Sequence, residues 1–469
     1  MSDKKPITAI IIGAGYRGKD SFGKFAKENP DKLNIVGVAE PNNVKRKEMR
    51  DIYQIPKKYT FTTWEEILKE QKFADVAIIT TRDNMHTKPT LKALELGYDI
   101  LLEKPIAQTL DESVKIVKKA EELGRQLQIC HEFRYTGFFS KIHEIVQSGK
   151  LGQIIKINME ENMSYWHFGH GYVRGIARNT EVAAPLILAK CCHDLDLMHW
   201  IIGDKPKKLS SFGSLIHFKP ENAPPGATKR CLDGCPHKET CIFYAPILYI
   251  DYTPMLNIAR EADSKLANIG GWLTIKHKKL TKFMSKFIPR LKLAIEFKDW
   301  PISAITEDFS VEGRWKAIKE GPYGRCVYFC DNNVVDNQVI NIEFENGITG
   351  VFSVQGHAPI EGRYIRIDGT DGMLTGNFKV TGEKIWFYDK LTMKKKLIYH
   401  KKIQEQGHDA GDDRLMEEFI ERIRTGKVKP FNDARSHLES HFMGFAAEKS
   451  RLENIIIDMN KFRKEALGE

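Results

Sequence analysis

The sequence has few cysteines and no long apolar run. Its eight cysteines in 469 residues are too sparse for the disulfide framework of a small secreted protein, so we expect most of them to be reduced thiols. No uninterrupted apolar stretch approaches the roughly 20 residues that cross a bilayer, which argues against stable membrane insertion. The N-terminus is polar and basic and has no apolar signal region. Together these absences predict a cytoplasmic protein.

The sequence also lacks a large excess of either positive or negative charge. The net charge of +10 is a mild excess for a chain of this length, and although it suits an anionic partner, solubility alone accounts for it. We therefore expect no nucleic-acid partner. The composition is that of a globular protein, and the length predicts two or three domains.

The first apolar run is followed at once by three closely spaced glycines. Residues 7–12 suit a central parallel strand, and a helix is predicted over residues 19–28. Strand, GxGxxG and helix in this order are typical of dinucleotide binding. The first glycine allows a tight turn, the second lets the backbone approach the pyrophosphate, and the third lets helix and strand pack closely. The loop residues expected to contact the cofactor are Gly13, Gly15, Tyr16, Arg17 and Gly18.

The next strand ends on an acidic residue. Residues 33–39 are apolar and Glu40 follows them, about 20 residues past the glycines, where this fold places an acid on the adenosine ribose hydroxyls. Glu40 favours NAD over NADP, because a 2′-phosphate would meet a like charge, and Arg46 is the nearby residue that could offset this preference. The alternative interpretation of Glu40 is a carboxylate that stabilises a helix start.

A charged pair lies at the end of a later strand. Residues 100–102 are apolar, and Glu103-Lys104-Pro105 follows. A strand of this composition is typically buried on both faces, and ligands collect outside the carboxyl ends of such strands. Proline restricts the residue before it, so we expect Lys104 to be held in one extended geometry as a candidate for proton transfer or charge stabilisation. The alternative is an ordinary solvated strand end. Strands and helices alternate up to residue 130, which predicts an α/β domain with a doubly wound parallel sheet.

Three motifs together carry a resemblance to a known family. They are the glycine-rich loop, Asn84-x-His86, and Glu103-Lys104-Pro105. With them the first third of the chain resembles the glucose-fructose oxidoreductase / inositol dehydrogenase / MocA (Gfo/Idh/MocA) family of NAD(P)-dependent oxidoreductases. The resemblance implies that Lys104 lies beside the nicotinamide and the substrate hydroxyl, and that Asn84 and His86 lie near the nicotinamide. We add the neighbouring Thr81 and Glu103 to the candidate cofactor-binding residues.

The resemblance also implies two domains. Residues 1–130 would form a Rossmann domain, and residues 131–469 would form an α+β domain for substrate binding and oligomerisation, with a cysteine-containing insertion around 219–330. Strand-like patterns between residues 339 and 369 predict an open, mainly antiparallel sheet with helices on one face. In the family this sheet usually carries the subunit interface, so we expect a homo-oligomer, either a dimer or a tetramer.

Two stretches after residue 130 are candidates for substrate binding. Residues 165–175 are dense in aromatic and hydrogen-bonding side chains, which suits a polyhydroxylated ligand because rings pack on C–H faces and Arg or His bonds hydroxyls. A loop without a function is the alternative. The candidates in and near this stretch are Tyr135, Trp166, His167 and Arg174.

The second stretch is residues 189–196. The family usually has an aspartate four residues before a histidine and another three residues after it. His193 and Asp196 match, but Ala189 stands where the first aspartate is expected, so either Lys190 or Asp194 fills part of its role or the substrate differs. His193 is the candidate general acid/base, since an imidazole pKa of about 6.5 suits proton transfer near neutral pH. Lys104 would polarise the hydroxyl or share the proton.

The insertion holds a cluster of cysteines and a basic segment. Cys231, Cys235 and Cys241 fall within eleven residues, and Cys326, Cys330 or His237 could complete the four ligands of a structural zinc ion. Reduced structural thiols are the alternative, and a redox role is a further one. Residues 276–292 carry seven positive charges and no acid, which fits contact with a membrane surface or an acidic partner, although Pro289 favours a solvated lid over the active site.

The leading hypothesis is an NAD-dependent oxidoreductase that takes a hydride from a secondary hydroxyl of a sugar, a sugar derivative or a cyclitol. One alternative is a glycoside-cleaving enzyme that retains NAD and works by transient oxidation followed by elimination, as some relatives with this fold do. Another is a non-catalytic regulator that binds NAD or a sugar.

Overall fold

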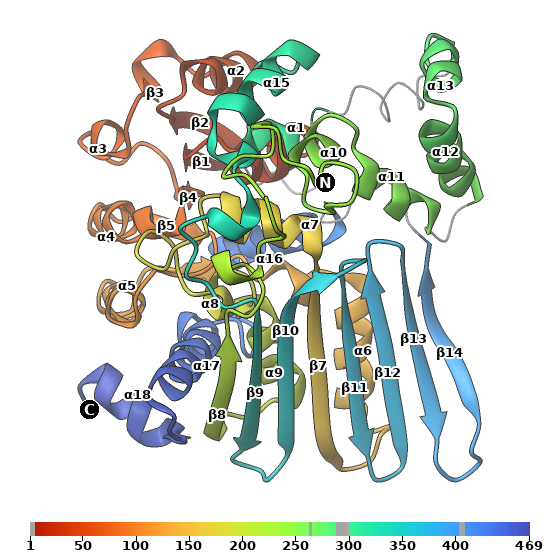
Figure 1. The fold of residues 1–469 in the computed structure, drawn as a ribbon. Helices are drawn as coiled ribbons and strands as arrows, with labels where there is room; N and C mark the ends of the chain where they lie inside the picture. The colour runs from red at the N-terminus through yellow and green to blue at the C-terminus, as the bar shows by residue number, and fades with distance from the viewer. Residues whose placement is uncertain (1–4, 262–264, 288–297, 299, 403–408) are drawn as a thin grey trace.

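The computed structural model describes residues 5–261, 265–287, 298, 300–402 and 409–469. Its N-terminal part is a sheet in the order β3-β2-β1-β4-β5-β6, and neighbouring strands pair in parallel (Figure 1). The strands are β1 (Ile7–Ile12), β2 (Leu33–Ala39), β3 (Thr60–Phe61), β4 (Val76–Ile79), β5 (Asp99–Leu102) and β6 (Leu127–Ile129).

Helices cover both faces of this sheet. They are α1 (Lys24–Glu28), α2 (Asn43–Tyr53), α3 (Trp64–Ile67), α4 (Thr87–Glu95) and α5 (Leu110–Glu122). Successive side chains of a strand point to opposite faces, and accordingly Ile10 packs in one core with α4 and α5, whereas Ile11 packs in another with α1 and α2. The predicted doubly wound Rossmann fold is confirmed.

The C-terminal part contains a second sheet, in the order β14-β13-β12-β11-β7-β10-β9-β8-β15 as far as the chain is described. Strands β7 and β10 pair in parallel, and the other neighbours pair antiparallel. The strands are β7 (Ile154–Ser164), β8 (Pro206–Ser214), β9 (Asn337–Phe344), β10 (Thr349–Ala358), β11 (Gly362–Gly369), β12 (Gly372–Lys379), β13 (Gly382–Asp389), β14 (Lys395–Lys401) and β15 (Ile457–Asp458). The predicted open, mainly antiparallel sheet is confirmed.

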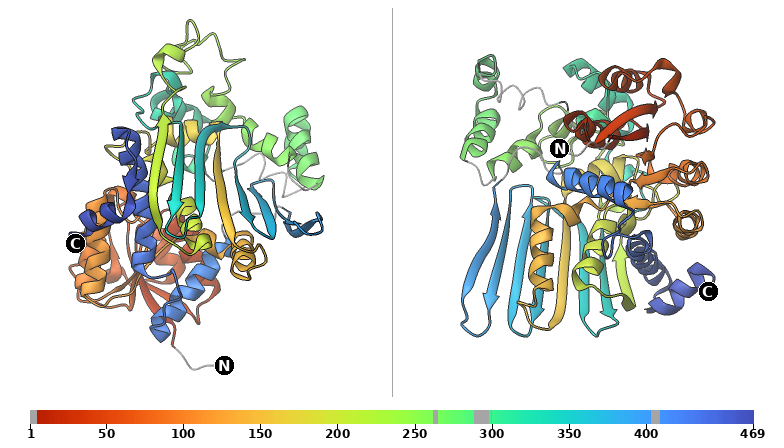
Figure 2. Two further views of the ribbon diagram at one scale, coloured as in Figure 1. Left: turned by 90° about the horizontal axis from the view of Figure 1, so that it is seen from below. Right: turned by 180° about the vertical axis from the view of Figure 1, so that it is seen from behind.

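One face of this second sheet carries helices α6 (Gly137–Gln147) and α9 (Cys192–Ile202), as the rear view shows (Figure 2). Among the described helices, none lies across the opposite face, which is turned toward the viewer in Figure 1. The subunit interface expected on this sheet stays a prediction.

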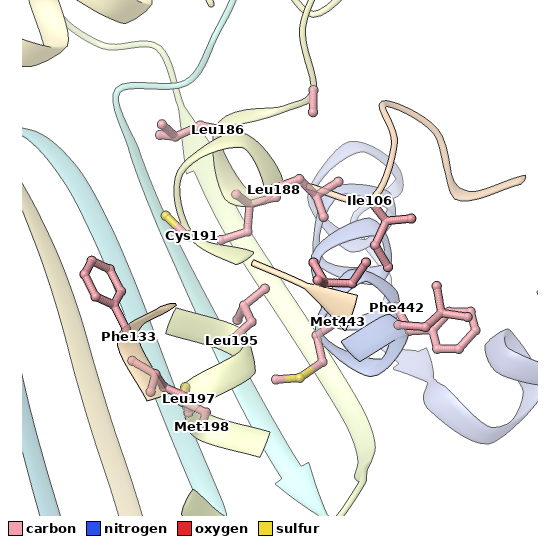
Figure 3. Close-up of a cluster of buried hydrophobic side chains, with 14 of the residues drawn as sticks. Ile106, Phe133, Leu186, Leu188, Cys191, Leu195, Leu197, Met198, Phe442 and Met443 are labelled. Carbon is pink, nitrogen blue, oxygen red and sulfur yellow. The ribbon is translucent and has the colours of Figure 1, made fainter. Parts of the chain in front are cut away.

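A tightly packed core joins the two parts of the molecule. Side chains of α8 (Leu186–Ala189) and α9 interlock with those of the long helix α17 (Ala434–Glu453), as the positions of Leu188, Leu195 and Met443 show (Figure 3). Helix α16 (Asp409–Thr425) returns to the Rossmann domain and buries Leu415 and Phe419 against the face of the sheet that contains Ile11. The end of the chain thereby holds the cofactor domain against the second sheet, and α18 (Met459–Leu467) follows.

The segment between β8 and β9 packs largely on itself. Its helices are α10 (Ala245–Tyr249), α11 (Thr253–Arg260), α12 (Lys265–Lys276), α13 (Lys278–Met284) and α15 (Val311–Glu320), and the short α7 (Tyr165–Phe168) lies beside it. Tyr249, Ile302 and Ile318 form a separate buried cluster there, to which Trp166 also belongs. The segment thus contributes to a small buried core, and the insertion boundaries of 219–330 stay a prediction.

The predicted basic segment lies mostly at the far end of this insertion. Its described part covers the end of α12 and all of α13, which project beyond α11 at the side opposite α2 and α3 (Figure 1). Residues 288–292 of the segment fall outside the described residues. The lid, membrane and acidic-partner roles stay predictions. No helix in the described parts of the chain combines the length and apolarity needed to cross a membrane.

Candidate active site

The glycine-rich loop has the geometry that dinucleotide binding requires. Gly13 has a φ of +99°, and a Cβ there would meet the Thr80 carbonyl oxygen at 2.8 Å. A Cβ on Gly18 would lie 2.1 Å from the Gly13 carbonyl oxygen, whereas a Cβ on Gly15 would meet nothing within 4 Å. The first and third glycines are therefore needed for the protein's own packing, and the second faces open space where a pyrophosphate would fit.

This difference gives a prediction for two matched variants. Gly18→Ala is expected to destabilise the fold by about 1–3 kcal/mol, because the new methyl group collides with backbone. Gly15→Ala is expected to leave the melting temperature nearly unchanged but to weaken NADH binding about tenfold or more, or about 1.4 kcal/mol. Thermal unfolding and NADH fluorescence titration measure the two effects, and equal melting temperatures for both variants would contradict this assignment.

Glu40 lies at the end of β2 beside this loop. Its carboxylate accepts hydrogen bonds from the backbone N–H of Ala14 at 2.7 Å and of Asn42 at 2.9 Å. Arg46 does not pair with this carboxylate, since its guanidinium donates to the backbone carbonyls of Glu40 and Pro41 and to the Asn43 side chain. The Glu40 carboxylate therefore lies beside the loop without a pairing guanidinium from Arg46, at the end of β2 where ribose recognition is expected.

Arg17 links three elements. It pairs with Glu103 at 2.5 Å and makes a bidentate pair with Asp412 of α16 at 2.7 and 2.8 Å. Burial opposes the charged form, but Glu103 and other nearby carboxylates raise the pKa of Arg17 well above its ordinary value. The sequence predicts that Arg17 and Glu103 contact the cofactor, and the structure places them in an ion-pair network that fastens the loop to β5 and α16.

The three candidate cofactor residues after β4 lie in different environments. The hydroxyl oxygen of Thr81 is buried and lacks a hydrogen-bond partner among the described residues, so it is available to a cofactor. Asn84 is exposed. His86 is buried, and its Nδ1 and Nε2 lie 2.8 and 3.1 Å from the carbonyl oxygens of Pro105 and Thr81. His86 therefore holds the ends of two neighbouring strand segments together.

Lys104 extends from the end of β5 toward the helix pair α8 and α9. Its ammonium group donates a hydrogen bond to the carbonyl oxygen of Ala189 at 3.1 Å. Ala189 is the position where the resemblance led us to expect an aspartate, and its contact to Lys104 comes from the backbone oxygen because its side chain has no carboxylate.

His193 and Glu132 form a buried pair near Lys104. His193 Nε2 lies 3.4 Å from a Glu132 carboxylate oxygen, and His193 Nδ1 is buried without a hydrogen-bond partner in the described part of the chain. Burial, reinforced by Lys104 and His131, lowers the pKa of His193 well below its ordinary value. Burial also raises the pKa of Glu132 to about 7, against the opposing effect of Arg17. His193 is thus a neutral proton acceptor next to a carboxyl that exchanges its proton near neutral pH.

A second polar group, which we call the Lys190 cluster, contains Lys190, Glu161, Glu361 and His167. Lys190 lies 2.9 Å from Glu361 and 3.3 Å from Glu161, and His167 Nδ1 lies 2.7 Å from Glu361. Burial opposes the charge on Lys190, but the two carboxylates raise its pKa. The cluster is one residue away from Ala189 along the chain and is bordered by the rings of Trp166 and Trp300.

The sequence matches two models of one protein family. Residues 7–131 match the model described as "Oxidoreductase family, NAD-binding Rossmann fold", and residues 307–441 match "Oxidoreductase family, C-terminal alpha/beta domain". The chain belongs to the Gfo/Idh/MocA oxidoreductase family. Its first domain is accordingly an NAD(P)-binding Rossmann domain, and the confirmed fold of both domains agrees with this membership.

Several known proteins are similar to this chain. YteT of Bacillus subtilis, which is named as an oxidoreductase, is 21% identical over 87% of this chain and 88% of its own length. Inositol 2-dehydrogenase of Salmonella typhimurium is 23% identical over 44% of this chain and 57% of its own length. The structure of aldose-aldose oxidoreductase from Caulobacter crescentus has a TM-score of 0.61 at 13% identity and covers 97% of this chain and 100% of its own, which supports the fold alone.

Three predicted substrate residues are engaged in contacts within the protein, one of them through Arg363, which also pairs with Glu161 of the Lys190 cluster at 3.1 Å. Asp194 is fully buried and pairs with Arg363 at 2.6 Å. The hydroxyl of Tyr135 donates to Glu418 of α16 at 3.0 Å. Arg174 is buried among the cysteines of the insertion, where it donates to Cys231 Sγ. Their contacts join parts of the protein, and the expectation of substrate binding by these three residues lacks support from the geometry.

Some site residues escaped the sequence interpretation. Glu132 follows the carboxyl end of β6 just as Lys104 follows that of β5, so the same rule could have identified it. Glu161 and Glu361 gave no local signal, because they meet Lys190 from β7 and from the connection between β10 and β11.

Proposed function

We propose that this Gfo/Idh/MocA member oxidises a secondary hydroxyl of a sugar, a sugar derivative or a cyclitol with NAD. The observation that carries the proposal is the arrangement of Lys104, His193 and Glu132 at the carboxyl edge of the cofactor-binding sheet. Bound NAD would accept the hydride from the substrate carbon. Glu40 supports NAD over NADP, because its carboxylate would repel a 2′-phosphate.

The chain's own residues would handle the hydroxyl proton. An N–H of the Lys104 ammonium would polarise the hydroxyl oxygen, and His193 Nδ1, an acceptor without a partner in the described chain, would take the proton. Glu132 would then stabilise the imidazolium from the other side of the ring, at Nε2. In the opposite direction the same groups would return the proton.

The Lys190 cluster supports a substrate with several hydroxyls. Charged donors and acceptors stand beside the rings of Trp166 and Trp300, and this combination suits the alternating polar and C–H surfaces of a sugar ring. The names of the similar proteins, inositol 2-dehydrogenase and aldose-aldose oxidoreductase, point to the same substrate class.

The test is absorbance at 340 nm over a panel of free sugars, cyclitols and glycosides with NAD or NADP, with sugar products assayed in parallel. Steady NADH formation with one hydroxylated compound, and slower turnover with NADP, is the expected result. Glycoside cleavage that needs NAD but leaves the absorbance flat would instead support the alternative in which transient oxidation drives elimination.

The raised pKa of Glu132 predicts a pH dependence. Only the ionised carboxylate stabilises an imidazolium, so kcat/KM for oxidation is expected to rise with pH through an inflection near 7 and to level off above it. Glu132→Gln cannot ionise and should lose this inflection as well as part of the rate. A pH profile of kcat/KM for both proteins checks the assignment, and an unchanged inflection in Glu132→Gln would assign the titration to another group.

A further inference from the structure

The insertion has two features that the proposed hydride transfer does not use. One is the group of candidate zinc ligands Cys231, Cys235 and Cys241, which line one small space. Within the described residues no three cysteine sulfurs lie within 4.8 Å of one another, and the structural zinc stays a prediction. The other feature is a contact with the Rossmann domain at the end of β2. The carboxylate of Glu307, which lies before α15, accepts a hydrogen bond from the side-chain amide of Asn42.

Asn42 connects Glu307 to Glu40. Its backbone N–H donates to the Glu40 carboxylate at 2.9 Å. Its side-chain oxygen caps α2 by accepting the backbone N–H groups of Val44 at 2.9 Å and Lys45 at 3.0 Å, which leaves the amide nitrogen available to donate to Glu307. Two carboxylates from distant parts of the sequence therefore contact one residue at the N-terminus of α2, and Figure 1 accordingly draws α15 beside α2.

The segment that carries Glu307 is fixed from the side of the insertion. Ile302, shortly before it, is completely buried in the small core of that segment. The backbone N–H of Asp308 donates to the Thr306 hydroxyl at 3.0 Å, and the Asp308 carboxylate accepts the N–H of Ser310 at 3.0 Å. Short polar side chains that bond the nearby backbone in this way stabilise a turn, and α15 begins directly after it. Glu307 is thus presented to the Rossmann domain by an ordered turn.

The position of Glu307 bears on the choice between NAD and NADP. In this fold the acid after the second strand binds the hydroxyls of the adenosine ribose, and NADP carries a phosphate in place of the 2′-hydroxyl. A phosphate monoester has nearly two negative charges at neutral pH, so it would be repelled by Glu307 as well as by Glu40. Arg46 is the nearby cation, but its guanidinium already donates to the carbonyl oxygens of Glu40 and Pro41 and to the Asn43 side chain.

We propose that Glu307 is a specificity-determining residue, through which the insertion adds a second carboxylate to the adenosine end of the cofactor site and strengthens the selection of NAD over NADP. The proposal rests on the proposed use of NAD but on no property of the substrate. Glu307 supplies both a hydrogen bond and a charge, and two substitutions separate them. Glu307→Gln keeps an acceptor for the Asn42 amide and removes the charge, whereas Glu307→Ala removes both.

The test is a fluorescence titration of the full chain and its variants with NADH and with NADPH. In Glu307→Gln we expect the affinity for NADPH relative to NADH to rise about threefold to tenfold, the effect of one unit charge on a phosphate roughly 8 Å away in water. The gain should shrink in about 1 M salt, because exposed charges are then screened. Glu307→Ala should show the same gain, and a gain confined to Glu307→Ala would overturn the role of the charge.

The matched control is Glu320→Gln. Glu320 is an exposed glutamate at the far end of α15, a helix of 10 residues, so it lies about 15 Å from the start of that helix. The variant removes the same charge from the same segment and should leave the relative affinity for NADPH unchanged. Equal relative affinities in the wild type and Glu307→Gln would overturn the proposal. These titrations need no turnover, so a failure of the proposed hydride transfer would be seen separately, as a protein that binds NADH but oxidises no hydroxylated compound.

Discussion

Replacing Lys104 by methionine is expected to lower kcat/KM for oxidation of the substrate hydroxyl by about 10²- to 10⁴-fold, the usual range for loss of a proton-transfer group. The ammonium group stands at the carboxyl end of β5, and its neighbours Ala189 and His193 come from the second domain. Methionine keeps the length and apolar stem of the side chain but cannot polarise an oxygen atom. We therefore expect NADH affinity and melting temperature to stay close to those of the wild type.

The matched control is Lys92→Met on α4, where the lysine is half exposed and reaches Glu95 only at 4.0 Å. This variant should retain full activity. If Lys104→Met kept kcat/KM within tenfold of the wild type, Lys104 would not be a catalytic residue and the proposed use of the β5 edge would be wrong. A parallel fall in NADH affinity would indicate damage to the cofactor site instead.

Arg134→Met is expected to destabilise the protein by about 3–5 kcal/mol, because it leaves the buried Asp196 carboxylate without its guanidinium partner. Arg134 Nε lies 2.5 Å from Asp196, and both side chains are almost completely buried. Burial alone would raise the pKa of Asp196, but Arg134 and His131 lower it well below its ordinary value. The energy of this network therefore depends on the charged pair.

Chemical denaturation at neutral pH measures this change. Arg366→Met removes an arginine that pairs with Asp368 on the exposed side of β11, and it should cost no more than about 1 kcal/mol. Because the pKa of Asp196 is depressed, its contribution is fully present above the pKa of an unfolded aspartate and disappears as the pH falls through the folded value. The difference between wild type and Arg134→Met should therefore shrink only in acid, and a loss equal to that of Arg366→Met would show that the pair adds little.

Local patterns in the sequence were sufficient to predict the strands and the glycine-rich loop of the cofactor domain. Parallel strands buried on both faces are short apolar runs, so β1 and β2 could be placed from residues 7–12 and 33–39 alone. The roles of the glycines follow from backbone sterics, which involve only near neighbours and the adjacent strand. The position of Lys104 at the end of β5 could be predicted from the apolar run before it, and the carboxyl end of a parallel strand is a general binding edge.

Partners that lie far apart in the chain could not be predicted in this way. Arg17 and Asp412 are separated by 395 residues, and Lys190 and Glu361 by 171 residues. The position of β7 between β11 and β10 is what brings Glu161 to the Lys190 cluster, and short-range patterns contain no information on that strand order. The same limit explains why Arg174 was predicted to bind substrate. Its local sequence suits a sugar site, but the side chain is buried beside Cys231, which is distant in the chain.

In the proposed reaction NAD receives and keeps a hydride from a hydroxylated substrate, with Lys104 beside the reacting oxygen. Single-turnover absorbance at 340 nm tests it most directly, with the protein saturated with NAD and mixed with the active compound from the panel. The predicted trace rises to about one NADH per chain and stays there in the wild type, and it is slowed in Lys104→Met by about 10²-fold or more. A rise that decays as a glycoside is cleaved, or a trace that is the same in both proteins, would contradict the account.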